Sequence, residues 1–174
     1  MNNKKRRLCT LLVAATAACC SMAQTQIVID HASHGGAEVG YRYGFVDENE
    51  KWVIPPKYDN AEWHQQEGFA IVTLYRDGDR PQQKGVINKF GEFTMPLSAE
   101  NNKIRHEAES GTLLVARKHD GRLLWGIYSF DGKELIPVKY SKLTFEDGQF
   151  VAELPSGATA SFDRQGKPIG GAAE

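Results

Sequence analysis

The five histidines are the residues of this 174-residue chain that could bind a metal ion. His31 and His34 form a His-x-x-His pair near the N-terminus, whereas His64, His106 and His119 are far apart in the sequence. A zinc site needs three or four ligands that converge from defined elements. One isolated pair and three scattered residues do not predict such a site, so we expect no bound metal and no other cofactor.

Other patterns that could support catalysis are also weak. The glycine-rich stretch "HGGAEVG" at 34–40 lacks the lysine and the strand-to-helix context of a phosphate-binding loop. Carboxylates are numerous in the expected turns, where Asp commonly forms local hydrogen bonds. No Ser-His-Asp order stands out. A small hydrolase stays open as an alternative of low weight, but we expect no catalytic residue and predict that the protein is not an enzyme.

The first 23 residues have the three-part form of a secretory signal peptide. Four basic residues precede a mostly apolar run at 8–20, which is too short to span a bilayer, and small residues surround a cleavage site after Ala23. This pattern predicts an exported chain, periplasmic or secreted, with no transmembrane segment. A lipoprotein anchored at Cys19 is the minor alternative, because Thr16 stands where such sequences usually carry Leu.

Removal of the signal peptide would leave a mildly acidic chain without cysteine. The full chain has 21 basic and 22 acidic residues, so loss of the four basic residues leaves 17 against 22, a formal charge of −5. All three cysteines (Cys9, Cys19 and Cys20) lie in the part removed, which excludes disulfides and cysteine metal sites from the mature chain. A chain without a basic field is not expected to bind nucleic acid.

A segment of the chain recurs with a period of 41 residues. The copies share a glycine, a proline eleven residues later and, in two of them, a tyrosine fourteen residues later: Gly44, Pro55 and Tyr58; Gly85 and Pro96; Gly126, Pro137 and Tyr140. The middle copy has Ala99 in place of the tyrosine. A period of this length is typical of an array in which each unit is a supersecondary element stacked on its neighbours.

The residue pattern of each copy predicts three strands. A short β-favouring segment follows the first glycine, and a turn that ends in a further glycine leads to a second strand, which we expect the proline to end. The turn glycines are Gly91, Gly132 and Gly166. An excursion then leads to a third strand, and the excursions at 59–68 and 99–111 leave room for a helical turn or two. Hairpins within and between units, such as the one at Asp120-Gly121, give an all-β antiparallel meander.

Two copies, "YGFVDENEKWVIPPKY" at 43–58 and "WGIYSFDGKELIPVKY" at 125–140, closely resemble the WG repeat, also called the KWG repeat, of bacterial proteins. The resemblance covers about residues 41–169, although the Trp-Gly signature itself occurs once, at Trp125-Gly126. It implies a structural or interaction module and no catalytic residues. The absence of a uniform signature argues against one ligand bound identically by every copy.

These patterns together predict an open β-repeat array. About three and a half units are too few to close a propeller, so the array should have two ends. The segment "QIVID" at 26–30 could supply a first strand or cap one end. The expected division is a signal peptide, a lead-in, a repeat domain with three copies and a partial fourth, and a flexible tail: 1–23; 24–40; 41–169, with copies at 43–83, 84–124, 125–158 and 159–169; and 170–174.

Trp63 and the adjacent His64 are the best candidates for contact with a ligand or partner, because no other copy has a tryptophan in its excursion. An exposed tryptophan can form a sugar platform or a protein hot spot, although tryptophan is more often buried in a core. We therefore predict an exported, non-catalytic repeat protein that binds a protein partner. The alternative is a carbohydrate-binding accessory domain at the cell envelope.

Overall fold

The computed structural model describes residues 26–32, 40–47, 49, 51–75 and 82–170, and within these ranges it contains strands and no helix. It therefore contains no helix, in these ranges, that is long and apolar enough to cross a membrane. The predicted signal peptide with Cys19, and also His34, lie outside the described residues. The strands form four antiparallel sheets.

Each sheet is a meander in which neighbouring strands are consecutive in the chain. Sheet A contains β1 (Gln26–Ala32), β2 (Gly40–Val46) and β3 (Trp52–Tyr58). Sheet B contains β4 (Asn60–His64), β5 (Phe69–Leu74), β6 (Gln83–Asn88) and β7 (Phe93–Ser98). Sheet C contains β8 (Lys103–Glu107), β9 (Thr112–His119), β10 (Arg122–Tyr128) and β11 (Glu134–Tyr140). Sheet D contains β12 (Lys142–Glu146), β13 (Gln149–Glu153), β14 (Thr159–Phe162) and β15 (Pro168–Ile169).

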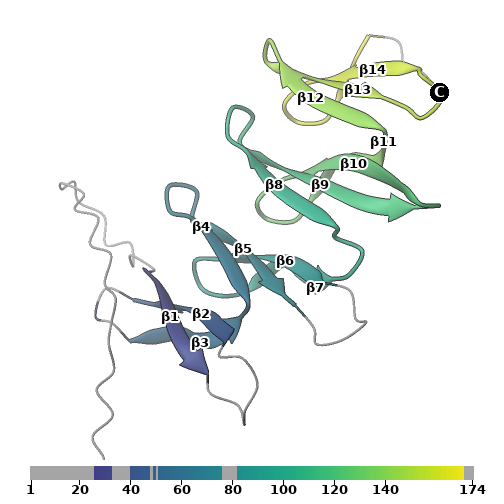
Figure 1. Cartoon of the computed structure of the whole chain (residues 1–174). Helices are drawn as coiled ribbons and strands as arrows, with labels where there is room; N and C mark the ends of the chain where they lie inside the picture. The colour runs from purple at the N-terminus through teal and green to yellow at the C-terminus, as the bar shows by residue number, and fades with distance from the viewer. Residues whose placement is uncertain (1–25, 33–39, 48, 50, 76–81, 171–174) are drawn as a thin grey trace, which may run out of the picture.

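The sheets follow one another as an open array, with sheet A at the lower left and sheet D at the top of Figure 1. The all-β, antiparallel repeat architecture predicted from the period is confirmed. The segment "QIVID" falls in β1, which pairs along its whole length with β2, so it supplies the first strand of sheet A.

The period contains four strands, not the three that we predicted. The excursions form β4, β8 and β12, and each opens a new sheet instead of a helical turn. Each of these short strands buries its second residue: Ala61, Ile104 and Leu143. Residues two positions apart in a strand share a face, so Trp63, His106 and Phe145 lie on the same side as these buried residues. One 41-residue period therefore begins in one sheet and ends in the next.

The prolines lie inside their strands and do not end them. Opposite Gly44, the register between β2 and β3 shifts from Phe45↔Ile54 to Tyr43↔Tyr58, so that the proline segment of β3 bulges over the glycine. A Cβ on Gly44 would lie 2.6 Å from the carbonyl oxygen of Ile54. The repeated glycine is thus needed to make room for the bulge, and the proline is tolerated because bulged edge strands need fewer amide donors.

The turn glycines hold successive sheets together. Gly132, in the β10–β11 turn, has φ 85° and donates its amide to the carbonyl oxygen of Ser129. A Cβ at this position would overlap the backbone of Thr94 in sheet B. Glycine is therefore required both for the left-handed backbone and for the close approach of two sheets. Gly91 and Gly166 make the corresponding contacts with Ile54 and Leu135.

The hydrophobic core is divided into three joints, one between each pair of neighbouring sheets. The A–B joint contains Phe45, Ile54, Tyr58, Ala61, Ala70, Val72 and Ile87. The B–C joint contains Phe69, Ile71, Val86, Met95, Ile104, Leu113, Val115 and Tyr128. The C–D joint contains Leu114, Ile127, Ile136, Tyr140, Leu143, Phe150, Ala152 and Phe162. Successive residues of β5 and β9 enter opposite joints, which is why these strands are apolar without alternation.

Tyr58 and Tyr140 are buried in the joints, with 1% and 3% of their surface exposed, so each ring packs between two neighbouring sheets. The middle copy compensates for its missing tyrosine by a different residue. Asn101 stands three residues before the buried Ile104, as the tyrosines stand before Ala61 and Leu143, and only 2% of its surface is exposed. Its side-chain amide donates to the carbonyl oxygen of Lys84 at 3.1 Å, so a polar bridge replaces the ring.

Candidate functional site

Trp63 packs in the A–B joint. It lies in β4, is half-buried, and meets the ring of Phe45 edge to face with centroids 5.9 Å apart. Its indole Nε1 is buried and has no hydrogen-bond partner among the described residues. Trp63 therefore contributes mainly to packing, and its ring does not stand free of the surface as a sugar platform would.

His64 follows Trp63 in β4 and points to the opposite face of sheet B, toward sheet C. His106 lies in β8 of sheet C, on the same side of the strand as the buried Ile104, and points back toward sheet B. The two imidazole rings meet between the sheets with centroids 4.6 Å apart and planes at 74°. Strand alternation on both sides of the B–C joint thus brings together two histidines that are distant in the sequence.

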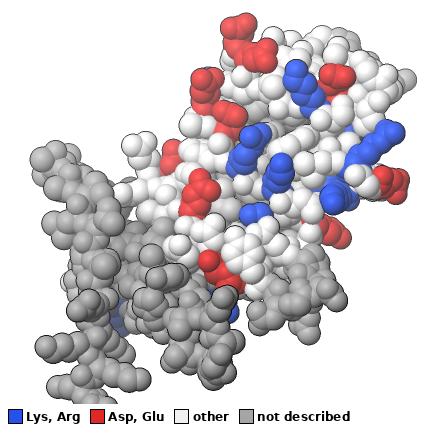
Figure 2. Space-filling view, viewed as in Figure 1, with Lys and Arg blue, Asp and Glu red and all other residues white. Residues whose placement is uncertain are grey.

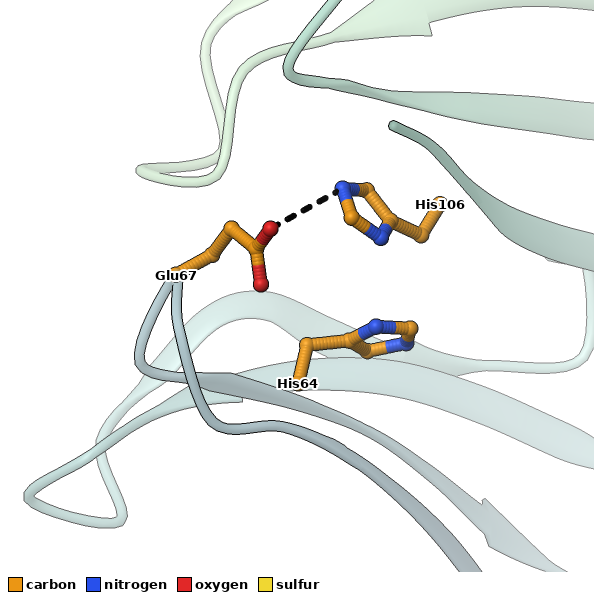
Figure 3. A group of neighbouring side chains, drawn as sticks. All are labelled: His64, Glu67 and His106. Carbon is orange, nitrogen blue, oxygen red and sulfur yellow. Dashed lines mark ion pairs between the residues drawn. The ribbon is translucent and has the colours of Figure 1, made fainter. Parts of the chain in front are cut away.

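Glu67 completes the group from the β4–β5 turn. One of its carboxylate oxygens lies 3.8 Å from Nε2 of His106. The ligand atoms of His64, Glu67 and His106 all lie within 4.8 Å of one another. Figure 3 shows the carboxylate beside the two rings; His64 comes from sheet B and His106 from sheet C. We call these three residues the histidine cluster.

Aromatic rings form one wall of the histidine cluster. His64 stacks on Phe69 with centroids 4.5 Å apart, and Phe69 in turn stacks on Phe130 of the β10–β11 turn at 4.5 Å. His106 meets Phe130 edge to face at 5.5 Å. Both imidazoles are therefore packed against neighbouring rings, which restricts their orientations.

The two imidazoles are largely removed from water. Their side chains are 15% exposed in His64 and 11% exposed in His106. Nε2 of each ring is buried without a hydrogen-bond partner among the described residues. Glu62 lies 3.3 Å from Nε2 of His64, at ion-pair distance. Burial lowers the pKa of His64 below its usual value, the nearby His106 adds to this effect, and the carboxylates of Glu62 and Glu67 oppose it.

Comparison with known families identifies the repeat. Residues 43–75 match the family model of the WG containing repeat. This segment is similar to a WG repeat. The matched segment runs from within β2 to the end of the β5 region and so crosses from sheet A into sheet B. No curated protein and no solved structure matches the chain.

The matched WG repeat contains Trp63, His64 and Glu67, whereas His106 comes from the next copy along the chain. The histidine cluster is therefore a feature of the contact between copies. The same hairpin in sheet C has Glu107, Ser110 and Thr112 at the places of His64, Glu67 and Phe69, because both hairpins have loops of the same length. Here Ser110 Oγ lies 2.7 Å from Thr112 Oγ1 and donates to the carbonyl oxygen of Glu107 at 3.2 Å.

The sequence identified one member of the histidine cluster and missed two. His64 was singled out beside Trp63, but His106 and Glu67 were not. Once the two excursions are aligned on their buried residues, Ala61 and Ile104, the parity of each strand shows which histidine faces which neighbour. Of the remaining histidines whose side chains are described, His119 is 77% exposed and stands apart, at the β9–β10 turn.

Two imidazoles and one carboxylate are ligands that zinc and similar divalent ions accept in proteins. The same groups could exchange a proton, but the buried Nε2 atoms give a substrate no direct access to them. The arrangement is therefore better suited to hold a small ion between the sheets than to act on a bound molecule.

Proposed function

We propose that this WG-repeat protein is an exported, non-catalytic module that binds a protein partner along one side of its array. The observation that supports this is a row of exposed aromatic side chains. Trp52 is 40% exposed, Phe93 is 43% exposed and Phe90 is 68% exposed. Large aromatic side chains supply much of the binding energy of protein interfaces, and their exposure in a free protein marks interaction sites. We call Trp52, Phe90 and Phe93 the aromatic row.

The aromatic row extends over two sheets. Trp52 and Phe93 occupy equivalent places, at the start of the proline strands of sheets A and B, opposite Val46 and Ile87. Phe90 is next to Gly91, which rests on Ile54 of sheet A, so it lies near the contact between the two sheets. Packed sheets are about 10 Å apart, so a ligand that contacts both ends must span at least that distance. A polypeptide segment meets this requirement more readily than a single sugar ring.

Charge and burial support a protein partner over the alternatives. On the face shown in Figure 2, basic side chains gather toward the middle and acidic side chains flank them, so this face does not present an uninterrupted basic field for nucleic acid. The partial burial of Trp63 weakens the carbohydrate alternative, which depended on that ring. The buried nitrogens of the histidine cluster weaken the hydrolase alternative. Export is supported by the N-terminal sequence pattern.

The test is capture of the partner through the aromatic row. A photo-crosslinking residue at Phe90 should trap a protein from native envelope extract, and the purified partner should then bind the chain in solution. We expect the double variant Trp52→Ala with Phe93→Ala to weaken this binding at least tenfold, because hot-spot aromatics carry a large share of the affinity. Calorimetric titration measures the change.

Tyr75 supplies the matched control, since it is 55% exposed, directly follows β5 and is not part of the row. Tyr75→Ala should leave the affinity unchanged. Equal loss in both variants, or binding that neither variant alters, would overturn the proposal. A glycan array that responds to the wild-type chain, with no bound protein, would instead support the carbohydrate alternative.

A further inference from the structure

We propose that His64, Glu67 and His106 form a binding site for a divalent transition-metal ion, Zn²⁺ by preference, that clamps sheet B to sheet C. This site is separate from the aromatic row and does not depend on the proposed partner. Its ligands would come from two successive copies, so an ion would connect strands whose contact is otherwise made by apolar packing.

The separations of the ligand atoms fit an open form of such a site. In a tetrahedral zinc site with bonds of about 2.0–2.1 Å, ligand atoms lie about 3.3 Å apart. Here the ligand atoms are within 4.8 Å of one another, and a carboxylate oxygen of Glu67 lies 3.8 Å from Nε2 of His106. Binding therefore requires a contraction of no more than about 1.5 Å. Glu67 can supply most of this movement, because its side chain extends from a turn and is 29% exposed.

The second argument is the unsatisfied nitrogen atoms. A buried polar atom without a partner costs about 1–3 kcal/mol, so most buried polar atoms in proteins are paired. Nε2 of His106 is buried, has no hydrogen-bond partner among the described residues, and is directed at the Glu67 carboxylate. A metal ion between these two groups would satisfy both at once.

The surroundings of His64 provide the usual support for a ligand histidine. Metal-binding histidines commonly direct their other ring nitrogen at a carboxylate, which fixes the ring and its tautomer. Glu62 lies 3.3 Å from Nε2 of His64, and this leaves Nδ1 as the nitrogen for the ion. The stacked ring of Phe69 holds the imidazole in place from one side.

The C–D joint shows that the packing of two neighbouring sheets does not by itself require the histidine cluster. Glu107, Ser110 and Phe145 occupy the equivalent places there, and Ser110 satisfies its neighbours by hydrogen bonds within the same hairpin. None of the described residues is a cysteine, so no disulfide joins the sheets in this part of the chain. Metal ions commonly stabilise small domains that lack such a link.

The experiment measures Zn²⁺ binding to the full chain after removal of metal by a chelator. We expect one ion per chain by calorimetry, a higher Tm with Zn²⁺, no change with Mg²⁺, and an absorption spectrum typical of tetrahedral coordination with Co²⁺. His106→Phe copies Phe145 of the next joint and should fold normally. Glu62→Ala removes a supporting carboxylate and should weaken Zn²⁺ binding about tenfold to hundredfold. His106→Phe removes a ligand and should weaken the binding by more than that.

Two controls separate this site from adventitious binding. The double variant His31→Ala with His34→Ala removes the His-x-x-His pair, and His119→Ala removes an exposed histidine; both should keep the full affinity. Glu67→Gln changes a half-exposed turn residue and tests the site without disturbing the joint. Zn²⁺ binding that survives both His106→Phe and Glu67→Gln, or that disappears with the His31 and His34 variant, would overturn the proposal.

Discussion

The B–C and C–D joints share the same backbone contacts between sheets, which we call the frame. They differ in whether the polar groups buried in the joint have hydrogen-bond partners. In each joint a turn glycine of the later sheet rests on the proline strand of the earlier sheet, Gly132 on Thr94 and Gly166 on Leu135. In each, alternate residues of the long central strand enter the core. The backbone contacts that define the array are therefore independent of the side chains that fill the joint.

The filling of the two joints is different. The B–C joint places Tyr128 and His106 where the C–D joint has Phe162 and Phe145, and Phe130 of its turn corresponds to Arg164. Arg164 lies over the ring of Phe145 with its guanidinium carbon 5.2 Å from the centroid, in the arrangement that His106 and Phe130 adopt at 5.5 Å. The C–D joint is thus satisfied by packing and local hydrogen bonds, whereas the B–C joint keeps unpaired nitrogens.

The largest effect is expected from breaking the shared frame. Gly132→Ala adds a Cβ that would overlap the Thr94 backbone, at a φ of 85°. We expect a loss of about 3 kcal/mol or more in the free energy of unfolding, because strain of about 1–3 kcal/mol adds to the displacement of the neighbouring sheet. Urea denaturation followed by tryptophan fluorescence measures the loss.

Gly121 gives the matched control for that substitution. Its φ is 77°, but no atom lies within 4 Å of the position that a Cβ would take. Gly121→Ala should therefore cost only the backbone strain, about 1 kcal/mol. If the two variants lose the same stability, the contact between sheets contributes little and the frame argument is wrong.

A smaller effect of opposite sign is expected from converting the B–C joint toward the C–D joint. In wild type the buried imidazole of His106 has an unpaired nitrogen. In the presence of a chelator, His106→Phe removes that nitrogen and supplies a phenyl ring that can pack on Phe130. We expect the variant to be about 1 kcal/mol more stable than the wild type under these conditions. Saturating Zn²⁺ should reverse the order, since only the wild type gains stability from binding.

Thermal unfolding of both chains, with chelator and with Zn²⁺, tests this reversal. Leu113→Phe in the same joint, which copies Phe150 opposite Phe145, serves as a control for ring size; it keeps all three ligands, so Zn²⁺ should stabilise it as much as the wild type. A wild-type chain that is the more stable one in chelator would mean that the imidazole nitrogens are satisfied, for example by water.

Local signals were sufficient to predict three of the four strands in each period and the hairpin between β9 and β10. Asp120 and Gly121 both adopt positive φ, at 48° and 77°, as a two-residue hairpin requires, and this follows from residue types alone. The proline bulge was not predictable in the same way. It depends on the absence of a Cβ on Gly44 in the facing strand, so the effect of Pro55 on its own strand is decided by a residue eleven positions earlier.

The candidate site depended on longer-range facts. His64 and His106 meet only because β4 and β8 open adjacent sheets and present opposite faces to the joint. The sequence period alone aligns Arg105 with His64, since 105 is 64 plus 41. In the structure Glu107 takes the place of His64, and His106 takes the place of Trp63. The middle copy has two more residues between its repeated glycine and the buried residue of its excursion strand: 19 from Gly85 to Ile104, against 17 from Gly44 to Ala61. This shift is visible only in the structure.

The smallest effect concerns the phenol that distinguishes Tyr128 from Phe162 and depends on pH. Burial raises the pKa of Tyr128 to about 12, the hydrogen bond that its hydroxyl donates to Glu134 at 2.5 Å adds to this, and Arg117 opposes it. The folded chain therefore holds this proton more tightly than the unfolded chain, whose tyrosine has a pKa near 10. The stability that results is present in full below pH 10 and is lost as the pH rises through about 12.

Tyr128→Phe removes both the hydrogen bond and this dependence on pH. We expect the variant to be about 1 kcal/mol less stable than the wild type at pH 8, and the difference to narrow between pH 10 and pH 12. Glu134 is exposed, so water satisfies its carboxylate in the variant and no buried charge is left behind. Urea unfolding at several pH values measures both effects, with Phe162→Tyr as the reciprocal change. A difference that stays constant up to pH 12 would show that the phenol ionises equally in both states, and the Tyr128 hydroxyl would then add no pH-dependent stability to the B–C joint.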